Sequence, residues 1–108
     1  MKKTTTIKAS AFDEAISLKE RYLNVALKAL IESCKTPTPD KKLIFLLCSY
    51  INTLKATIAT IATLLKKQID GIIVVTQLEA ASIRSHLRAL RFYKSEISTN
   101  FHFSLELH

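Results

Sequence analysis

Glycine and proline are almost absent from this chain of 108 residues, which has one glycine, Gly71, and two prolines, Pro37 and Pro39. A dinucleotide-binding fingerprint needs three glycines and a phosphate-binding loop needs two, so the sequence excludes both motifs. Sandwiches and barrels need many tight turns, which glycine, asparagine and proline usually supply. The composition therefore argues against an all-β fold and leaves long uninterrupted segments, which are typical of helices.

Cysteine is also scarce, with only Cys34 and Cys48. Two cysteines are too few for a disulfide scaffold, and no spaced set of histidines and cysteines indicates a structural zinc site. Both lie in apolar helical contexts, so we expect them to be small buried side chains. We predict no metal and no cofactor. The basic N-terminus is not followed by an apolar run and a cleavage site, so we expect a cytoplasmic protein.

Acidic residues are outnumbered: 9 aspartates and glutamates face 16 lysines and arginines, which gives a formal net charge of +7. This balance favours contact with nucleic acid, an acidic protein or an anionic membrane, and it says nothing about the fold. The hydrophobic content of 48% indicates a folded chain, and the length suits one small domain.

Two punctuating segments, KTPTPDKK and QIDG, divide the chain into three long pieces. The first has an apolar stripe at helical spacing from Ile16 to Cys34, behind Ser10 as a possible N-cap. The second has Thr38 as a possible cap and Pro39 at the first helical position. We predict helices over about 11–35, 39–67 and 72–95, with tails at 1–9 and 98–108.

The stretch KATIATIATLLKK repeats a triplet, and a period of three does not fit a strand. On a helix, successive triplets drift by about 60° around the axis. The straight rows are then a core ridge beginning at Leu54 and a neighbouring row in which Ala59 and Ala62 leave room for another helix. The run from Leu43 to Leu65 is also long enough to span a membrane, although Asn52 and Lys55 near its middle disfavour this.

Two segments have alternative interpretations. Ile72 to Val75 alone could be a strand, but helix formers follow at helical spacing, so we begin the third helix at 72 with Asp70 near its cap. In the tail, Phe101, Phe103 and Leu105 alternate with polar residues, which is typical of a half-buried strand. Such a strand would have to pair with the N-terminal TTTIKA or with another molecule, and the alternative is a frayed tail.

We therefore predict an all-α fold, a three-helix antiparallel bundle with a possible short terminal strand. Three helices this apolar leave more hydrophobic surface than one small bundle can hide, so we expect a homo-oligomer, most simply a symmetric dimer. The residues expected at its interface are Leu43, Leu47, Ala59 and Ala62.

One face of the third helix gathers positive charge. Arg84, Arg88 and Arg91 recur at spacings of four and three residues, with Lys94 beside them, and guanidinium groups can engage phosphate in bidentate fashion. Phe92 and Tyr93 lie close enough in sequence to supply a stacking surface for single-stranded nucleic acid, and Tyr93 is the one we count among the binding residues. The alternative is an ordinary solvated face whose arginines pair with glutamates. The candidate partners are Glu14, Glu32 and Glu96.

The hairpin from Tyr50 to Tyr93 resembles the central helical pair of HEPN-type domains, which are all-α bundles of bacterial defence and toxin systems. The matching features are the Asp70–Gly71 turn, Glu79 and the Phe92–Tyr93 pair. Active HEPN members cleave RNA with an arginine and a histidine at a short fixed spacing. Neither Arg84 with His86 nor Arg91 with His102 has that spacing, so the resemblance supports a helical bundle and not catalysis.

No nucleophile, base and orienting group are gathered in the sequence, so no catalytic residue is predicted. The leading hypothesis is a non-enzymatic binding or regulatory module that self-associates and presents a basic helix face to nucleic acid or an acidic protein. One alternative is a divergent HEPN-like ribonuclease or its inactive relative. Another is a small single-span membrane protein.

Overall fold

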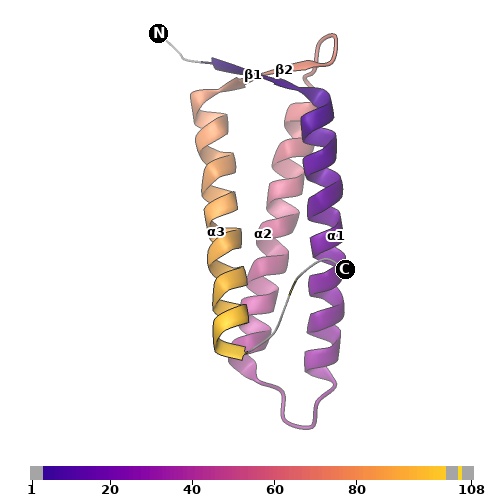
Figure 1. Ribbon diagram of the computed structural model, residues 1–108, viewed down its shortest axis with the longest axis vertical. Coiled ribbons are helices and arrows are strands. Elements are labelled where there is room, and N and C mark those ends of the chain that lie inside the picture. Colours follow the sequence, from indigo (N-terminus) through magenta and orange to yellow (C-terminus); the bar gives the residue numbers. More distant parts are fainter. Residues whose placement is uncertain (1–3, 102–104, 106–108) are drawn as a thin grey trace.

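The protein is an elongated bundle of three helices closed at one end by two short strands (Figure 1). It is described by a computed structural model that covers residues 4–101 and residue 105. The elements in chain order are β1 (Thr4–Lys8), α1 (Ala9–Cys34), α2 (Lys41–Leu65), β2 (Ile72–Thr76) and α3 (Gln77–Phe101). The chain is 77% helical, which confirms the predicted all-α bundle with a short strand.

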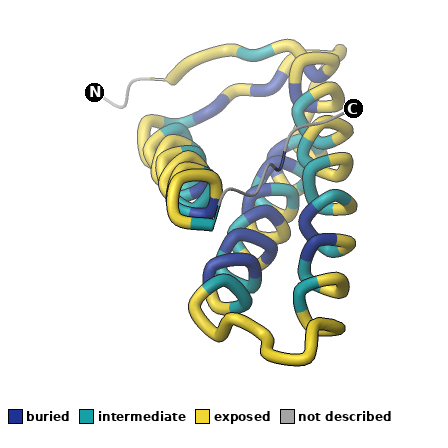
Figure 2. Tube along the Cα trace, turned by 60° about the horizontal axis from the view of Figure 1, so that its bottom comes forward, coloured by how far each residue is buried: buried dark blue, intermediate teal, exposed yellow. Residues whose placement is uncertain are grey.

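Helix α2 is the central element of the bundle. Both α1 and α3 run antiparallel to α2 and pack along it, whereas α1 and α3 make few contacts with each other. Figure 2 accordingly shows buried residues concentrated along α2. Eight residues of α2 are buried, against two in α3. The third helix therefore contributes few fully buried residues, and about half of its residues are exposed.

The buried side chains form two separate clusters. The sheet-end cluster lies under the strands, and its buried members are Ala9, Phe12, Ile61, Leu64, Ile73 and Val75. The distal cluster fills the other half of the bundle, and its buried members are Ala26, Ala29, Leu46, Leu47, Tyr50, Ile51, Leu54, Leu90, Ile97 and Leu105. Between them on α2 lies Thr57, which is fully buried and whose hydroxyl donates to the carbonyl of Thr53 at 2.7 Å.

The predicted start of the third helix at 72 is wrong, because Ile72–Thr76 is strand β2. It pairs antiparallel with β1, which places Ile73 opposite Ile7 and Val75 opposite Thr5. Ile73 and Val75 are buried while Ile72 and Val74 are exposed, the period-two pattern of a half-buried strand. The N-terminal segment does form a strand, as the TTTIKA interpretation allowed, but its partner is β2 and not the C-terminal tail.

A two-residue turn at Asp70 and Gly71 sets the direction of β2. Both residues have positive φ, 53° and 76°, and Ile69 and Ile72 exchange backbone hydrogen bonds of 2.9 and 3.0 Å. Two consecutive positive φ angles are typical of a type I′ turn, where glycine has no steric cost. The carbonyl of Gly71 also accepts from the N–H of Ala9 at 2.8 Å. Asp70 is thus a turn residue, and its predicted role as a helix cap is wrong.

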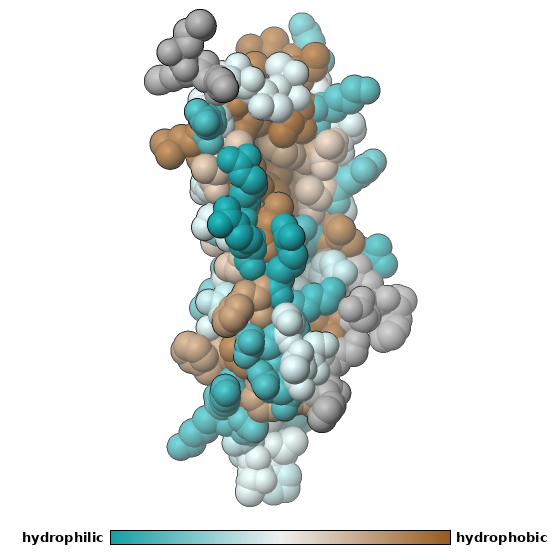
Figure 3. Space-filling view, turned by 60° about the vertical axis from the view of Figure 1, so that its left-hand side comes forward, coloured by the Kyte–Doolittle hydropathy of each residue, from teal (hydrophilic) through white to brown (hydrophobic). Residues whose placement is uncertain are grey.

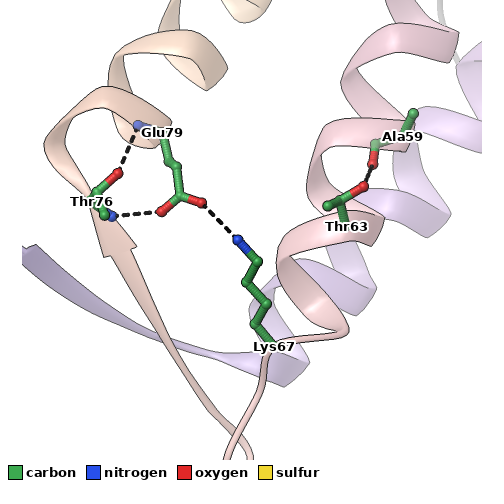
Figure 4. A network of polar contacts seen from close by, with 5 residues as sticks. All are labelled: Ala59, Thr63, Lys67, Thr76 and Glu79. Carbon is green, nitrogen blue, oxygen red and sulfur yellow. Dashed lines mark hydrogen bonds and ion pairs between the residues drawn. The ribbon is translucent and has the colours of Figure 1, made fainter.

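Helix α3 begins at a capping box built from Thr76 and Glu79 (Figure 4). The N–H of Glu79 donates to the Thr76 hydroxyl at 3.2 Å, and the N–H of Thr76 donates to the Glu79 carboxylate at 2.9 Å. The ammonium of Lys67 lies 3.6 Å from the other carboxylate oxygen. These bonds satisfy backbone donors that a helix start would otherwise leave unpaired, which explains why the helix begins at Gln77.

The other predicted boundaries need small corrections. Asp40, and not Thr38, is the N-cap of α2, because its carboxylate accepts from the N–H groups of Lys42 and Leu43 at 3.0 and 3.1 Å. Helix α1 starts at Ala9 without a side-chain cap, so Ser10 lies inside the helix.

The two cysteines are less buried than expected. Cys34 is exposed and Cys48 is half-buried, so the expectation of buried thiols is wrong for Cys34. Cys34 is the last residue of α1, where the apolar stripe reaches the loop to α2 and no helix covers it.

The predicted C-terminal strand is replaced at its start by helix, because α3 continues through Phe101 instead of ending near residue 95. Residues 102–104 and 106–108 lie outside the described residues. Leu105 is not in a strand, and its side chain is buried in the distal cluster.

Replacing Thr76 with alanine should lower the free energy of unfolding by about 1 kcal/mol, because the helix start loses its hydroxyl acceptor. Thr63→Ala is the matched control: its hydroxyl donates to the carbonyl of Ala59 at 2.8 Å, in mid-helix (Figure 4). That change should stay within about 0.5 kcal/mol. Urea unfolding of both variants gives the comparison, and equal losses would contradict the role of the capping box.

Glu79 should contribute to stability in a pH-dependent way. The hydrogen bond from the backbone of Thr76, then that of its side chain, lowers the pKa of Glu79 below its ordinary value of 4.5. Stability from a carboxylate with a lowered pKa is present above the ordinary value and is lost as the pH falls through the folded-state value. The unfolding free energies of wild type and Glu79→Gln should therefore differ most near neutral pH and converge on acidification, as measured by denaturant titration. A pH-independent difference would contradict this.

Candidate nucleic-acid interface

The three arginines predicted to form a binding face do lie on one exposed side of α3. Arg84, Arg88 and Arg91 are all exposed, and their spacing of four and three residues keeps them within about 60° of one another around the helix. Seven residues of helix separate the first from the last, about 10 Å along the axis. Figure 3 shows hydrophilic side chains gathered in a column on the side of the molecule that α3 occupies. We call Arg84, Arg88 and Arg91 the arginine face.

None of these guanidinium groups takes part in an ion pair within residues 4–101 and residue 105, where the salt bridge found is that between Lys67 and Glu79. The glutamates expected as partners lie elsewhere: Glu14 and Glu32 are exposed on α1, and the Glu96 carboxylate accepts from the Asn100 side chain at 2.9 Å. The arginine face is therefore not the paired surface that the alternative interpretation required.

The aromatic ring beside the arginine face is Phe92, and not Tyr93. Tyr93 is half-buried and packs against the distal cluster, whereas Phe92 is 57% exposed. The two rings meet edge to face, with centroids 5.6 Å apart and planes at 66°. Phe92 follows Arg88 by one helical turn, so the two share a face. Of the two rings predicted to supply a stacking surface, Phe92 is therefore the one exposed beside the arginine face. The order of residues around a helix could have shown this, because Tyr93 falls opposite Arg84.

Lys94 serves a different contact from the arginines. Its ammonium lies 4.8 Å from the centroid of the Tyr22 ring on α1, a cation–π distance. Lys94 is half-buried and bridges the two outer helices, which otherwise make few contacts with each other. Lys94 therefore lies at the edge of the arginine face, as predicted, but its ammonium points toward α1.

Between α1 and α3 lies a hollow of about 220 Å³, which the sequence analysis did not anticipate. Its cationic residues are Lys19, Arg91 and Lys94. Lys19 belongs to the face of α1 that otherwise carries Phe12, Ile16 and Leu23. A lysine within such an apolar stripe could have indicated from the sequence that a cation lies at this position between the helices. Burial lowers the pKa of Lys19 from its ordinary value of 10.5, because leaving water disfavours its charged form.

The four residues expected to support self-association lie in different environments. Ala59 is exposed, Leu43 and Ala62 are half-buried, and Leu47 is fully buried in the distal cluster. Leu47 packs inside one chain, so its side chain is not available to a second copy of this fold. Ala59 is the one of the four whose side chain is exposed.

His86 is half-buried on α3, and its side chain forms no hydrogen bond or ion pair with another residue in the part of the chain that the structure describes. Within the described ranges, no cluster of three histidine, cysteine, aspartate or glutamate side chains could hold a metal ion. Helix α2 is long and apolar enough to cross a membrane, but core helices of soluble proteins pass the same test. In this fold α2 is the helix that both neighbours cover, while Asn52 and Lys55 are exposed at its middle.

Comparison with known proteins adds no relative: no protein-family model matches the chain, and no curated protein or solved structure is significantly similar to it. The resemblance to HEPN-type domains therefore stays a prediction.

Proposed function

We propose that the protein is a non-enzymatic binding module that holds single-stranded nucleic acid on the arginine face of α3. The observation that supports this most directly is the exposure of three guanidinium groups on one helix face, without an acidic partner among the described residues. An unpaired row on a rigid helix fits a ligand that brings its own negative charges.

The dimensions of the arginine face suit a nucleic-acid strand. Its length of about 10 Å equals about three phosphate steps at 3.4 Å per nucleotide of a stacked strand. The formal net charge of +7 favours the approach of any polyanion. Between residues 80 and 95 the helix has four basic residues and no acidic one, so nothing on this stretch repels phosphate.

The exposed ring of Phe92 favours a single strand over a duplex and over an acidic protein. A base can stack on such a ring only when it is not enclosed in a duplex, and stacking contributes about 1–3 kcal/mol per base. Phe92 and Arg88 share a face, so one nucleotide can place its base on the ring and its phosphate on the guanidinium. An acidic protein would use the arginines without needing this ring.

Binding of a short oligothymidine should weaken as salt rises, and Arg88→Ala should reduce that salt dependence. Each phosphate contact contributes about 0.7 to the slope of log affinity against log salt for single strands. Three arginine contacts give a slope of about −2, and removing one should reduce its magnitude by about 0.7. Fluorescence anisotropy over a range of salt concentrations measures the slope.

Arg21→Ala is the matched control, because Arg21 is an exposed arginine on α1 and not on α3. If Arg21→Ala reduced the slope as much as Arg88→Ala, binding would reflect overall charge and the arginine face would have no special role. Loss of affinity in Phe92→Ser for the oligothymidine but not for the matching duplex supports stacking. Binding of a polyglutamate peptide in preference to the oligothymidine would instead indicate an acidic protein partner.

We also propose that self-association uses the outer face of α2. An exposed stripe without charge runs along this helix, and its members are Phe45, Asn52, Ala56, Ala59 and Thr63. They recur at helical spacing on one side of α2, opposite its buried residues. Phe45 is the large apolar member of this stripe, and its side chain is 67% exposed. Small side chains from Asn52 to Thr63 would let a second helix approach closely.

Ala59→Glu should shift the protein from dimer toward monomer, because a charged side chain would be forced into the contact between two α2 helices. Glutamate is a good helix former and position 59 is exposed, so the fold should be retained. Ala11→Glu, at an exposed position of α1, is the control and should leave the mass unchanged. Sedimentation equilibrium measures the mass of each variant. A wild-type protein that is monomeric at all concentrations would disprove this proposal.

A further inference from the structure

The middle of the bundle is the place where its apolar packing is interrupted. The sheet-end cluster includes Ala15 and Ile16 of α1, and the distal cluster resumes at Tyr22. Lys19 lies between them, on the same face of α1 and half-buried. A position that the helical repeat assigns to the core is therefore occupied by a cation.

Lys19 faces the hollow between the two outer helices. The floor and walls combine apolar, aromatic and cationic groups, and among the residues that the structure describes no acidic one lines the hollow. The lining residues are Lys19, Tyr22, Tyr50, Leu54, Leu87, Leu90, Arg91 and Lys94. The cations come from both α1 and α3, so positive charge converges on the hollow from opposite sides, over a floor supplied by α2.

The environment of Lys19 is unfavourable for its own charge. Desolvation lowers its pKa, and within the part of the chain that the structure describes no carboxylate forms an ion pair with it. A partly buried charge without a counter-ion costs free energy, which a bound anion would recover. Methionine or leucine would fill the same space without this cost.

We propose that this hollow binds a small amphipathic anion, with its carboxylate or phosphate on Lys19 and Arg91 and its alkyl or aryl body against Leu54, Leu87 and Leu90. The three leucines lie in the same hollow as the cations, so one ligand can meet both. Binding sites for drug-sized ligands begin at about 300 Å³, so a hollow of about 220 Å³ fits a smaller molecule. A nucleic-acid strand is too large to enter this hollow.

This site is distinct from the arginine face, although Arg91 borders both. Lys19 lies on α1 and belongs only to the hollow, whereas Arg84 and Arg88 belong only to the arginine face. Variants at Lys19 therefore test the anion site alone, and variants at Arg88 test nucleic-acid binding alone.

Octanoate and octanol are suitable probes, because they share an alkyl body and differ in charge. Octanoate should bind the wild-type protein more tightly than octanol, with amide shifts in NMR spectra at residues around Leu54 and Leu87. Lys19→Met keeps the length of the side chain and removes its charge. It should weaken octanoate binding by about ten- to a hundredfold, the value of one charge-assisted hydrogen bond, as measured by calorimetry.

Two control variants keep the result interpretable. Lys28→Met removes an exposed lysine from the same helix and should leave octanoate binding unchanged. Lys19→Arg keeps the charge and should retain binding, which separates loss of the site from loss of the fold. Lys19→Met should also bind oligothymidine as well as wild type does.

Three outcomes would overturn the anion site. Equal affinity for octanol and octanoate would show an apolar cleft without selection for charge. Equal losses in Lys19→Met and Lys28→Met would show a general effect of surface charge. Absence of octanoate binding by the folded wild-type protein would show that the hollow is not a ligand site for this class of anion.

Discussion

The burial of α2 between two helices that barely touch each other is the constraint on which the rest of the structure depends. Because both outer helices use α2 as their packing surface, each needs only a narrow apolar stripe. Helix α3, with two buried residues, can therefore present the arginine face on its exposed side. The same arrangement leaves a space between α1 and α3, and the cations of the hollow converge there. Both proposed binding surfaces follow from one packing geometry.

The sheet and the capping box determine where α3 begins, and so which residues it exposes. The type I′ turn at Asp70 and Gly71 reverses the chain after α2, and β1 holds β2 in extended form. Thr76 and Glu79 then start the helix. A start five residues earlier, as the periodicity suggested, would continue helix through a segment whose alternating residues are buried in the sheet-end cluster. Local hydrogen bonding at one end of the bundle thus determines the residue at which α3 begins.

The sequence was most informative where the signal was long and periodic. The predicted ends of the first two helices agree with α1 and α2 to within one turn, because many residues contribute to each stripe. The run Ile72–Val75 suits helix or strand locally, and its partner β1 lies at the other end of the chain, beyond any local pattern. Two features could have been predicted from the sequence and were not: the capping box, from threonine and glutamate three residues apart, and the position of Lys19, from a lysine within an apolar stripe. That no described carboxylate forms an ion pair with Arg88 depends on where α1 places its glutamates, which only the folded structure shows.

The pairing of β1 with β2 has a consequence for the order in which this chain folds. The register joins Lys8 to Ile72, so the sheet closes a loop that contains all of α1 and α2. Contacts between those two helices are closer in sequence and cost less entropy to form. During synthesis, β1 therefore cannot pair until β2 has been made, so Thr4–Lys8 is held in place only after α1 and α2 can already have packed.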